Sequence, residues 1–223
     1  MWNRRTHLIN NEPNGLVTMI EIKHKNSGET LVIVESDTLA GADLREERLE
    51  GADLKGVNLS GANLSSAELQ EADLSGANLQ RANLTGSHLN HANLSGCDLT
   101  GASLGNEMRS RAAYMLECDL TGANLQRANL RKVVLRNACL KKAILNRADF
   151  RGASCHGADL SGVVANNTLF IDANLREVNL SSADLRDSHL NAANMIKADL
   201  SDANMESLGD SSKFPRVRSL VNN

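Results

Sequence analysis

Residues 51–64 read GADLKGVNLSGANL. A leucine returns every five residues, with a small residue two places before it and Asp or Asn between them. A period of five matches neither the 3.6 of an amphipathic helix nor the 2 of an ordinary strand. It is typical instead of short extended segments that alternate with tight turns and wind into a parallel solenoid.

The same repeat organises most of the chain. Its central position runs from Leu39 to Leu104 in fourteen consecutive units that all carry Leu, and again from Met115 to Met205. This A(D/N)LXX pattern resembles the pentapeptide repeat family over about four-fifths of the chain. The resemblance implies an all-β fold, namely a right-handed quadrilateral β-helix with one repeat per face and four repeats per coil. The number of repeats in the sequence then predicts about eight coils.

The flanking sequences divide the chain into four parts. Residues 1–16 form a polar N-terminal segment, and residues 17–35 are expected to form a β-hairpin cap around a turn at 26–28. The β-helix should occupy residues 36–207. Residues 208–223 are expected to be a C-terminal cap or a dimerisation tail, because a stack of coils exposes unpaired backbone and apolar side chains at its end.

The repeat slips once, within residues 105–114. Leu104 and Met115 are eleven residues apart where two repeats would need ten, which predicts one inserted residue at a looped corner. Coils of twenty residues, with twenty-one across the slip, would stack Cys97 on Cys118 and Phe150 on Phe170. The slip, around residues 105–111, is either a tolerated surface insertion or a partner-contact loop.

Composition limits the class of protein. Hydrophobic residues make up 41% of the 223 residues but aromatic residues only 2%, which favours a narrow Leu/Ala interior. The start of the chain lacks the apolar run of a secretory signal, and no window approaches the roughly 18 apolar residues of a membrane helix. These features predict a soluble, cytoplasmic protein whose four cysteines are reduced.

Candidate chemical groups in the sequence do not form a site. His88 and His91 have metal-like spacing but no third ligand nearby, and both should point outward. In the pair Cys155-His156 the thiol should point inward and the imidazole outward. No glycine-rich phosphate loop is present, because the glycines follow the repeat. The sequence therefore predicts no enzyme activity, no cofactor and no metal.

Charge is distributed in blocks along a chain of net charge −3. Residues 29–75 sum to −8 (eleven acidic, three basic), residues 126–151 to +7 (eight basic, one acidic) and residues 172–210 to −5 (eight acidic, three basic). Because turn positions point outward, the basic run should encircle the rod as a belt. It is either a solvated surface or a docking surface for an acidic partner. The candidate contact residues are Arg109, Arg111, Arg127, Arg131, Lys132, Arg136, Lys141, Lys142, Arg147 and Arg151.

Two functions follow from these observations. The first is a non-catalytic protein–protein interaction or scaffold module, with an unknown protein partner and no membrane contact. Direct nucleic-acid binding is disfavoured, because so few aromatics accompany the basic residues. The alternative comes from the resemblance: quinolone-resistance members of the family mimic DNA and bind DNA gyrase, although the basic belt interrupts an acidic surface. A monomer and a C-terminal homodimer both remain open.

Overall fold

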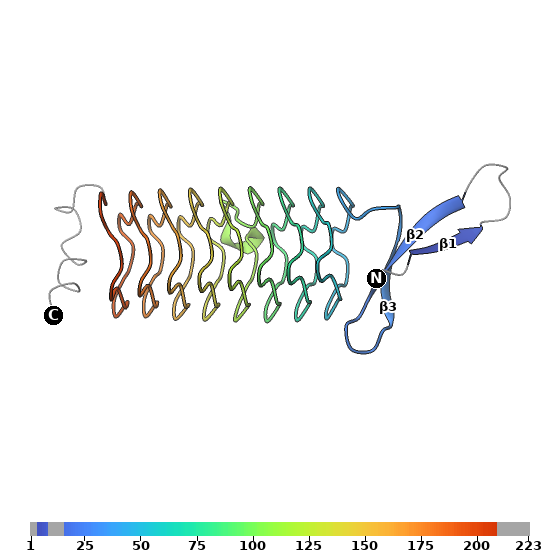
Figure 1. The fold of residues 1–223 in the computed structure, drawn as a ribbon, viewed down its shortest axis with the longest axis horizontal. Helices are drawn as coiled ribbons and strands as arrows, with labels where there is room; N and C mark the ends of the chain where they lie inside the picture. Colours follow the sequence, from blue (N-terminus) through green and yellow to red (C-terminus); the bar gives the residue numbers. More distant parts are fainter. Residues whose placement is uncertain (1–3, 9–15, 209–223) are drawn as a thin grey trace.

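The computed structural model describes residues 4–8 and 16–208 (Figure 1). Three strands, β1 (Arg4–Leu8), β2 (Leu16–Lys23) and β3 (Thr30–Glu35), form an antiparallel sheet in the order β1-β2-β3. The chain then winds into a long stack of coils, interrupted by one short 3-10 helix, η1 (Arg109–Arg111). The molecule is therefore a β-helix solenoid with a small sheet at its N-terminal end.

Each coil pairs with the next through single-residue parallel bridges. Asp43 pairs with Asn63, and Asn63 pairs with Asn83, so one coil takes twenty residues. Within the described residues, four such ladders run along the stack, beginning at Asp43, Arg48, Asp53 and Asn58. One coil thus contains four pentapeptides, each of which contributes to its own ladder.

The turn between ladders explains the rest of the motif. In the regular repeats, the residue two places after the central Leu has a positive φ, such as 65° at Gly56, and the next N–H donates back to the Leu carbonyl, as in Val57 to Leu54 at 3.2 Å. This is the geometry of a type II turn, which favours Gly at its third position. The motif Asp or Asn caps the turn: Asp73 Oδ1 accepts the N–H of Ser75 at 3.0 Å.

Leucine and alanine fill the interior. The central leucines from Leu49 to Leu84 are fully buried, as are most of the small residues that precede them. Phe150 and Phe170 lie in adjacent coils with their ring centroids 5.1 Å apart, which confirms the predicted stacking of these two residues. The buried side chains form one continuous hydrophobic core along the stack. In a solenoid of this kind, each layer is stabilised by its neighbours.

The N-terminal sheet closes one end of this column. Strands β2 and β3 form the hairpin expected from the sequence, and Ile20 and Ile22 of β2 are buried within the core. Backbone bonds join β2 to the first coil: Asp53 donates to the Lys23 carbonyl at 2.8 Å. Most of the polar N-terminal segment 1–16, and residues 209–223 of the expected C-terminal cap or dimerisation tail, lie outside the described residues.

Across the described residues, no helix has the length and apolar character needed to cross a lipid bilayer.

The predicted single inserted residue was wrong. His88 pairs with Tyr114, so that coil takes 26 residues and the insertion is six residues, 26 less 20. The interval from Leu104 to Met115 is one enlarged repeat, not two repeats with one extra residue. The predicted Cys97–Cys118 stack is also wrong, because the bridges place Cys97 over Ala123 and on a different face from Cys118.

Candidate interaction site

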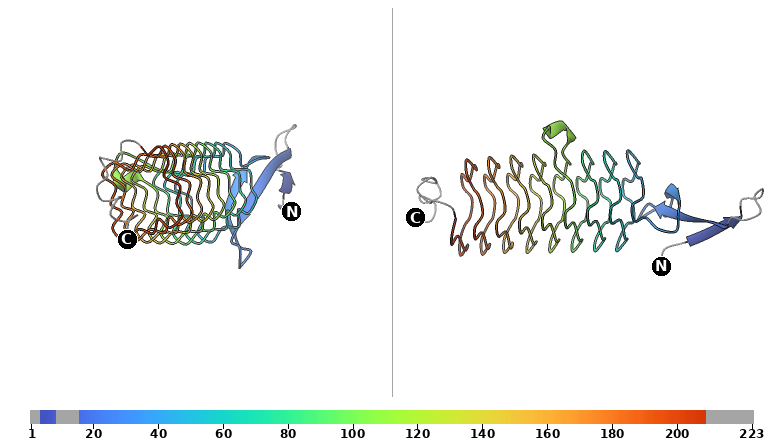
Figure 2. Two further views of the ribbon diagram at one scale, coloured as in Figure 1. Left: turned by 60° about the vertical axis from the view of Figure 1, so that its left-hand side comes forward. Right: turned by 90° about the horizontal axis from the view of Figure 1, so that it is seen from above.

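The six extra residues enlarge one repeat into a loop that leaves the stack at one corner. We call residues 105–113 the insertion loop; η1 stands at its tip and projects from the side of the rod (Figure 2). The N–H of Ala113 donates to the carbonyl of Leu104 at 2.8 Å, which closes the loop at its base. Ala112 and Ala113 are fully buried. The coils on either side therefore keep their register despite the insertion.

The first residue of the insertion loop lies directly against the next coil. The N–H of Gly105 donates to the carbonyl of Asn129 at 2.8 Å, and the Asn129 side-chain amide donates to the Gly105 carbonyl at 3.3 Å. A Cβ on Gly105 would lie 2.2 Å from the backbone nitrogen of Arg131. No residue with a side chain fits there without moving the backbone.

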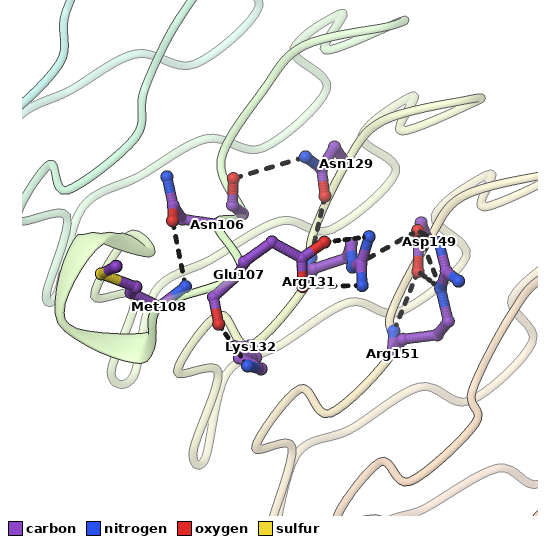
Figure 3. A network of polar contacts seen from close by, with 9 residues as sticks. Asn106, Glu107, Met108, Asn129, Arg131, Lys132, Asp149 and Arg151 are labelled. Carbon is purple, nitrogen blue, oxygen red and sulfur yellow. Dashed lines mark hydrogen bonds and ion pairs between the residues drawn. The ribbon is translucent and has the colours of Figure 1, made fainter.

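An ion-pair network fixes the loop above its base (Figure 3). Arg131 holds Glu107 through two contacts, from Nη1 to Oε1 at 2.5 Å and from Nη2 to Oε2 at 2.9 Å. Lys132 Nζ donates to the carbonyl of Glu107. Arg131 Nε lies 4.0 Å from Asp149 Oδ2, too far for a hydrogen bond, and Arg151 Nη2 lies 2.6 Å from the same oxygen.

Electrostatics favours the charged form of the carboxylate in this network. Burial raises the pKa of Asp149, but hydrogen bonds from the side chain and backbone of Arg151, with the charges of Arg151 and Arg131, outweigh it and leave that pKa below its usual value. The carboxylate therefore stays ionised; it accepts hydrogen bonds from Arg151 and attracts the guanidinium of Arg131 across 4.0 Å. Arg131 in turn holds the loop.

The tip of the loop presents an apolar side chain beside two cations. Met108 is 59% exposed, and Arg109, Ser110 and Arg111 of η1 are exposed as well. The N–H of Arg111 donates to the Met108 carbonyl at 3.0 Å, so the tip is a closed turn. Methionine packs adaptably against varied apolar surfaces, and arginine is enriched at protein interfaces.

The basic run encircles the rod, as its sequence positions imply. Its members occupy the outward turns of all four corners across two adjacent coils. We call this set the basic belt: Arg127, Arg131, Lys132, Arg136, Lys141, Lys142, Arg147 and Arg151.

The belt divides into residues with an internal role and residues without one. Arg131 and Arg151 belong to the loop network, Lys132 caps the Glu107 carbonyl, and Lys141 pairs with Asp159 at 3.2 Å. In the described part of the chain, the remaining four have no carboxylate partner: Arg127, Arg136, Lys142 and Arg147. The structure thus brings Arg131 and Lys132 to the insertion loop with Arg109 and Arg111, and places the unpaired cations around the other corners.

Sequence reasoning missed three residues that build this site: Gly105, Glu107 and Asn129. Glycines of the repeat normally follow the central Leu by two places, whereas Gly105 follows Leu104 directly. That displaced glycine is the signal of a close backbone approach at the start of an insertion.

The other polar groups weighed from the sequence lie apart from this site. His88 stacks edge-on against Tyr114, and His91 lies 3.6 Å from Glu117. Cys155 is fully buried whereas His156 is partly exposed. Over residues 4–8 and 16–208, no three His, Cys, Asp or Glu side chains gather in a way that would hold a metal ion.

The family model for pentapeptide repeats matches this chain in eight copies, over residues 38–70, 67–106, 113–152, 128–164, 153–191 and 168–206. These matches cover well over half of the chain and leave out most of the insertion loop. The chain belongs to the pentapeptide repeat family. Curated protein sequences yield no match to it.

Solved structures of other pentapeptide repeat proteins resemble this one. HetL of the cyanobacterium Nostoc sp. strain PCC 7120, involved in heterocyst differentiation regulation, is 28% identical, with 74% of this chain and 83% of HetL covered and a TM-score of 0.47. Full-length QnrB1, a plasmid-mediated fluoroquinolone resistance protein, is 18% identical, with 82% of this chain and 95% of QnrB1 covered and a TM-score of 0.38. Rfr23 of the cyanobacterium Cyanothece 51142 is 25% identical, with 51% and 87% covered and a TM-score of 0.28.

Proposed function

We propose that this pentapeptide repeat protein is a non-catalytic protein-interaction module that contacts its partner through the insertion loop and the adjoining part of the basic belt. The observation that carries the proposal is the pinned loop, whose Met108, Arg109 and Arg111 project into solvent while Glu107 is held by Arg131. A loop already fixed in place loses little conformational entropy when it binds. Such a loop is suited to recognition.

The charge of the surrounding surface determines the kind of partner. Residues 126–151 carry a net charge of +7, and the two arginines of the tip add to it. Complementary charge speeds association and excludes positively charged competitors. The partner in this proposal is therefore a protein with an acidic surface and an apolar pocket for Met108.

The gyrase-binding alternative finds less support in this arrangement. A protein that mimics DNA needs a continuous negative surface, whereas the basic belt interrupts the acidic segments at all four corners. The remaining parts of the proposal are a right-handed winding of about eight coils, a cytoplasmic location, no direct contact with nucleic acid, and either a monomer or a C-terminal homodimer.

The test compares proteins captured from the source cells by three forms of the full chain. The loop variant combines Met108→Ala, Arg109→Ala and Arg111→Ala. The matched control combines Ile33→Ala, Arg45→Ala and Arg48→Ala, which also removes one exposed apolar side chain and two arginines, at the other end of the rod. We expect quantitative mass spectrometry to show at least one protein retained by wild type and control but lost from the loop variant. Identical captured sets for all three forms would refute the proposal.

A further inference from the structure

A hollow of about 470 Å³ lies on the face that follows the insertion loop. Its lining comprises Arg136, Ser154, His156, Asn174, Arg176 and Glu177. The ladder of this face runs from Tyr114 through Val134 and Ser154 to Asn174, so the hollow lies two coils beyond the point where the loop rejoins the stack. The insertion loop and the hollow therefore border the same face of the rod.

A local change in the repeat opens this hollow. Most ladder positions carry Asp or Asn, whose side chain caps the following turn, as Asn174 does for Arg176 at 3.2 Å. Ser154 stands at that position in the middle of the hollow, and its short side chain fills less space. Asn174, His156 and the two arginines then form the walls.

The arginines of the hollow differ from the other arginines of the same repeat position. Where an Asp precedes such an arginine by two residues, the guanidinium folds back onto it: Arg45 on Asp43 at 2.6 Å, and Arg186 on Asp184 at 2.7 Å. Arg136 instead follows Val134, which has no carboxylate. Its side chain is exposed and, within the described residues, forms no ion pair.

The second arginine of the hollow, Arg176, forms an ion pair through only one of its three nitrogens in the described part of the chain. Arg176 follows Asn174, and its Nε donates to Glu177 Oε1 at 3.3 Å, which leaves its two terminal nitrogens without an ion pair in the described residues. Glu177 also lies 3.6 Å from Lys197 and 3.9 Å from His156. Since Arg176 and Lys197 offset the single carboxylate of Glu177, the charge of Arg136 leaves the hollow with an excess of positive charge.

We propose that this hollow binds a carboxylate side chain from an acidic peptide segment of the partner protein. Arg136 supplies the bidentate fork that a planar carboxylate prefers, and Arg176 closes the opposite side. Between the hollow and the insertion loop, the half-buried Tyr114 and Val134 accept an apolar residue of the same segment. The inference rests on the proposed interaction function and adds the chemistry that the partner must carry.

The test measures peptide binding by fluorescence anisotropy with the full chain at low ionic strength. The probe is a labelled peptide of alternating Glu and Val, and its uncharged counterpart alternates Gln and Val. We expect the Glu peptide to bind and Arg136→Ala to weaken it about tenfold, because one bidentate charge-assisted contact is lost. The matched control is Arg186→Ala, which removes an arginine at the same repeat position outside the hollow and should leave the Kd unchanged.

Three results would overturn the inference: equal binding of the Glu and Gln peptides, equal losses in both arginine variants, or saturation of the hollow by inorganic phosphate without peptide binding. The last result would assign the hollow to phosphoryl groups. Failure of the interaction function is distinguishable. In that case the loop variant captures the same proteins as wild type, while the Arg136→Ala effect on the peptide persists.

Discussion

Phe150 and Phe170 stack in adjacent coils with their rings tilted by 33° and their centroids 5.1 Å apart. The coil of Phe150 also holds Cys155 and Ala165 at central positions that Leu occupies in most other coils. All four side chains are fully buried. Since a protein core keeps nearly constant density, the two small side chains make room for the two rings.

Replacement of one ring should therefore leave a cavity that its neighbours cannot fill. We expect Phe170→Ala to lower the free energy of unfolding by about 3–5 kcal/mol, measured by guanidinium denaturation. Ala165→Leu should also destabilise, by about 1–3 kcal/mol, because the rings already occupy that space. A stabilised Ala165→Leu variant would show that the coil has spare volume.

A cavity in the regular part of the stack should also lower the free energy of unfolding. Leu74 is fully buried in the middle of the N-terminal half. Leu74→Ala should lower the free energy of unfolding by about 2–5 kcal/mol if the narrow core does not collapse around it. Lys55→Ala, at an exposed turn, is the control and should change it by less than about 0.5 kcal/mol. An unchanged denaturation midpoint for Leu74→Ala would contradict inward placement of the leucines.

The repeat could be predicted from the sequence because the residues that determine its structure lie within each five-residue unit. Leu54 and Ala52 point inward, Asp53 caps the turn, and Gly56 accepts its positive φ, all within one pentapeptide. The size of the insertion could not be predicted in this way. An eleven-residue interval fits two repeats plus one residue as well as one repeat plus six, and only pairing between coils distinguishes them.

The candidate site was predictable only in part, for a similar reason. The basic residues could be counted and placed at turns, but their partners lie in other coils: Glu107 meets Arg131 across 24 residues. Within the described residues Arg136 has no carboxylate partner, and this too depends on what surrounds it in neighbouring coils. Local sequence therefore predicts where charges point, and the stacking of coils determines which of them remain available to a partner.

Gly105 provides a test of the loop base. A Cβ added at Gly105 would clash with the backbone of Arg131, so Gly105→Ala should force the insertion loop off the next coil. We expect a loss of about 1–3 kcal/mol in unfolding free energy and faster trypsin cleavage after Arg109 and Arg111. The control is Gly56→Ala, which has a positive φ but nothing within 4 Å of the added Cβ. It should cost about 1 kcal/mol without exposing the loop. Equal cleavage in both variants would show that the close approach does not hold the loop.

The cysteines should differ in reactivity according to their burial. Burial raises the pKa of Cys97 and of Cys155 to about 12, and it also raises the pKa of Cys118. Thiolate is the reactive form, so these three should resist iodoacetamide near neutral pH. Cys139 is only partly buried and should react at least about tenfold faster, as followed by mass spectrometry. In denaturant all four should react alike. Equal rates in the folded protein would indicate that the coils open.

Asp149 links the loop network to acid stability. Its pKa is lowered in the folded state, because hydrogen bonds from Arg151 outweigh the opposing effect of burial. At pH values above the unfolded pKa of about 3.8, both states are ionised and the full stabilisation is present. As the pH falls below that value, the unfolded state takes up a proton first, and the stabilisation is lost as the pH passes through the folded pKa.

Asp149→Asn should therefore lower the free energy of unfolding near neutral pH. On acidification, the variant should lose less of its unfolding free energy than wild type does. The measurement is the free energy of unfolding at about pH 6 and about pH 3, for wild type and variant. The matched control is Asp172→Asn at an exposed turn. The same acid loss in wild type and Asp149→Asn would show that the Asp149–Arg151 pair does not couple protonation to folding. A smaller loss in Asp149→Asn alone, together with faster loop cleavage, would show that this carboxylate stabilises both the coil and the arginine that holds Glu107.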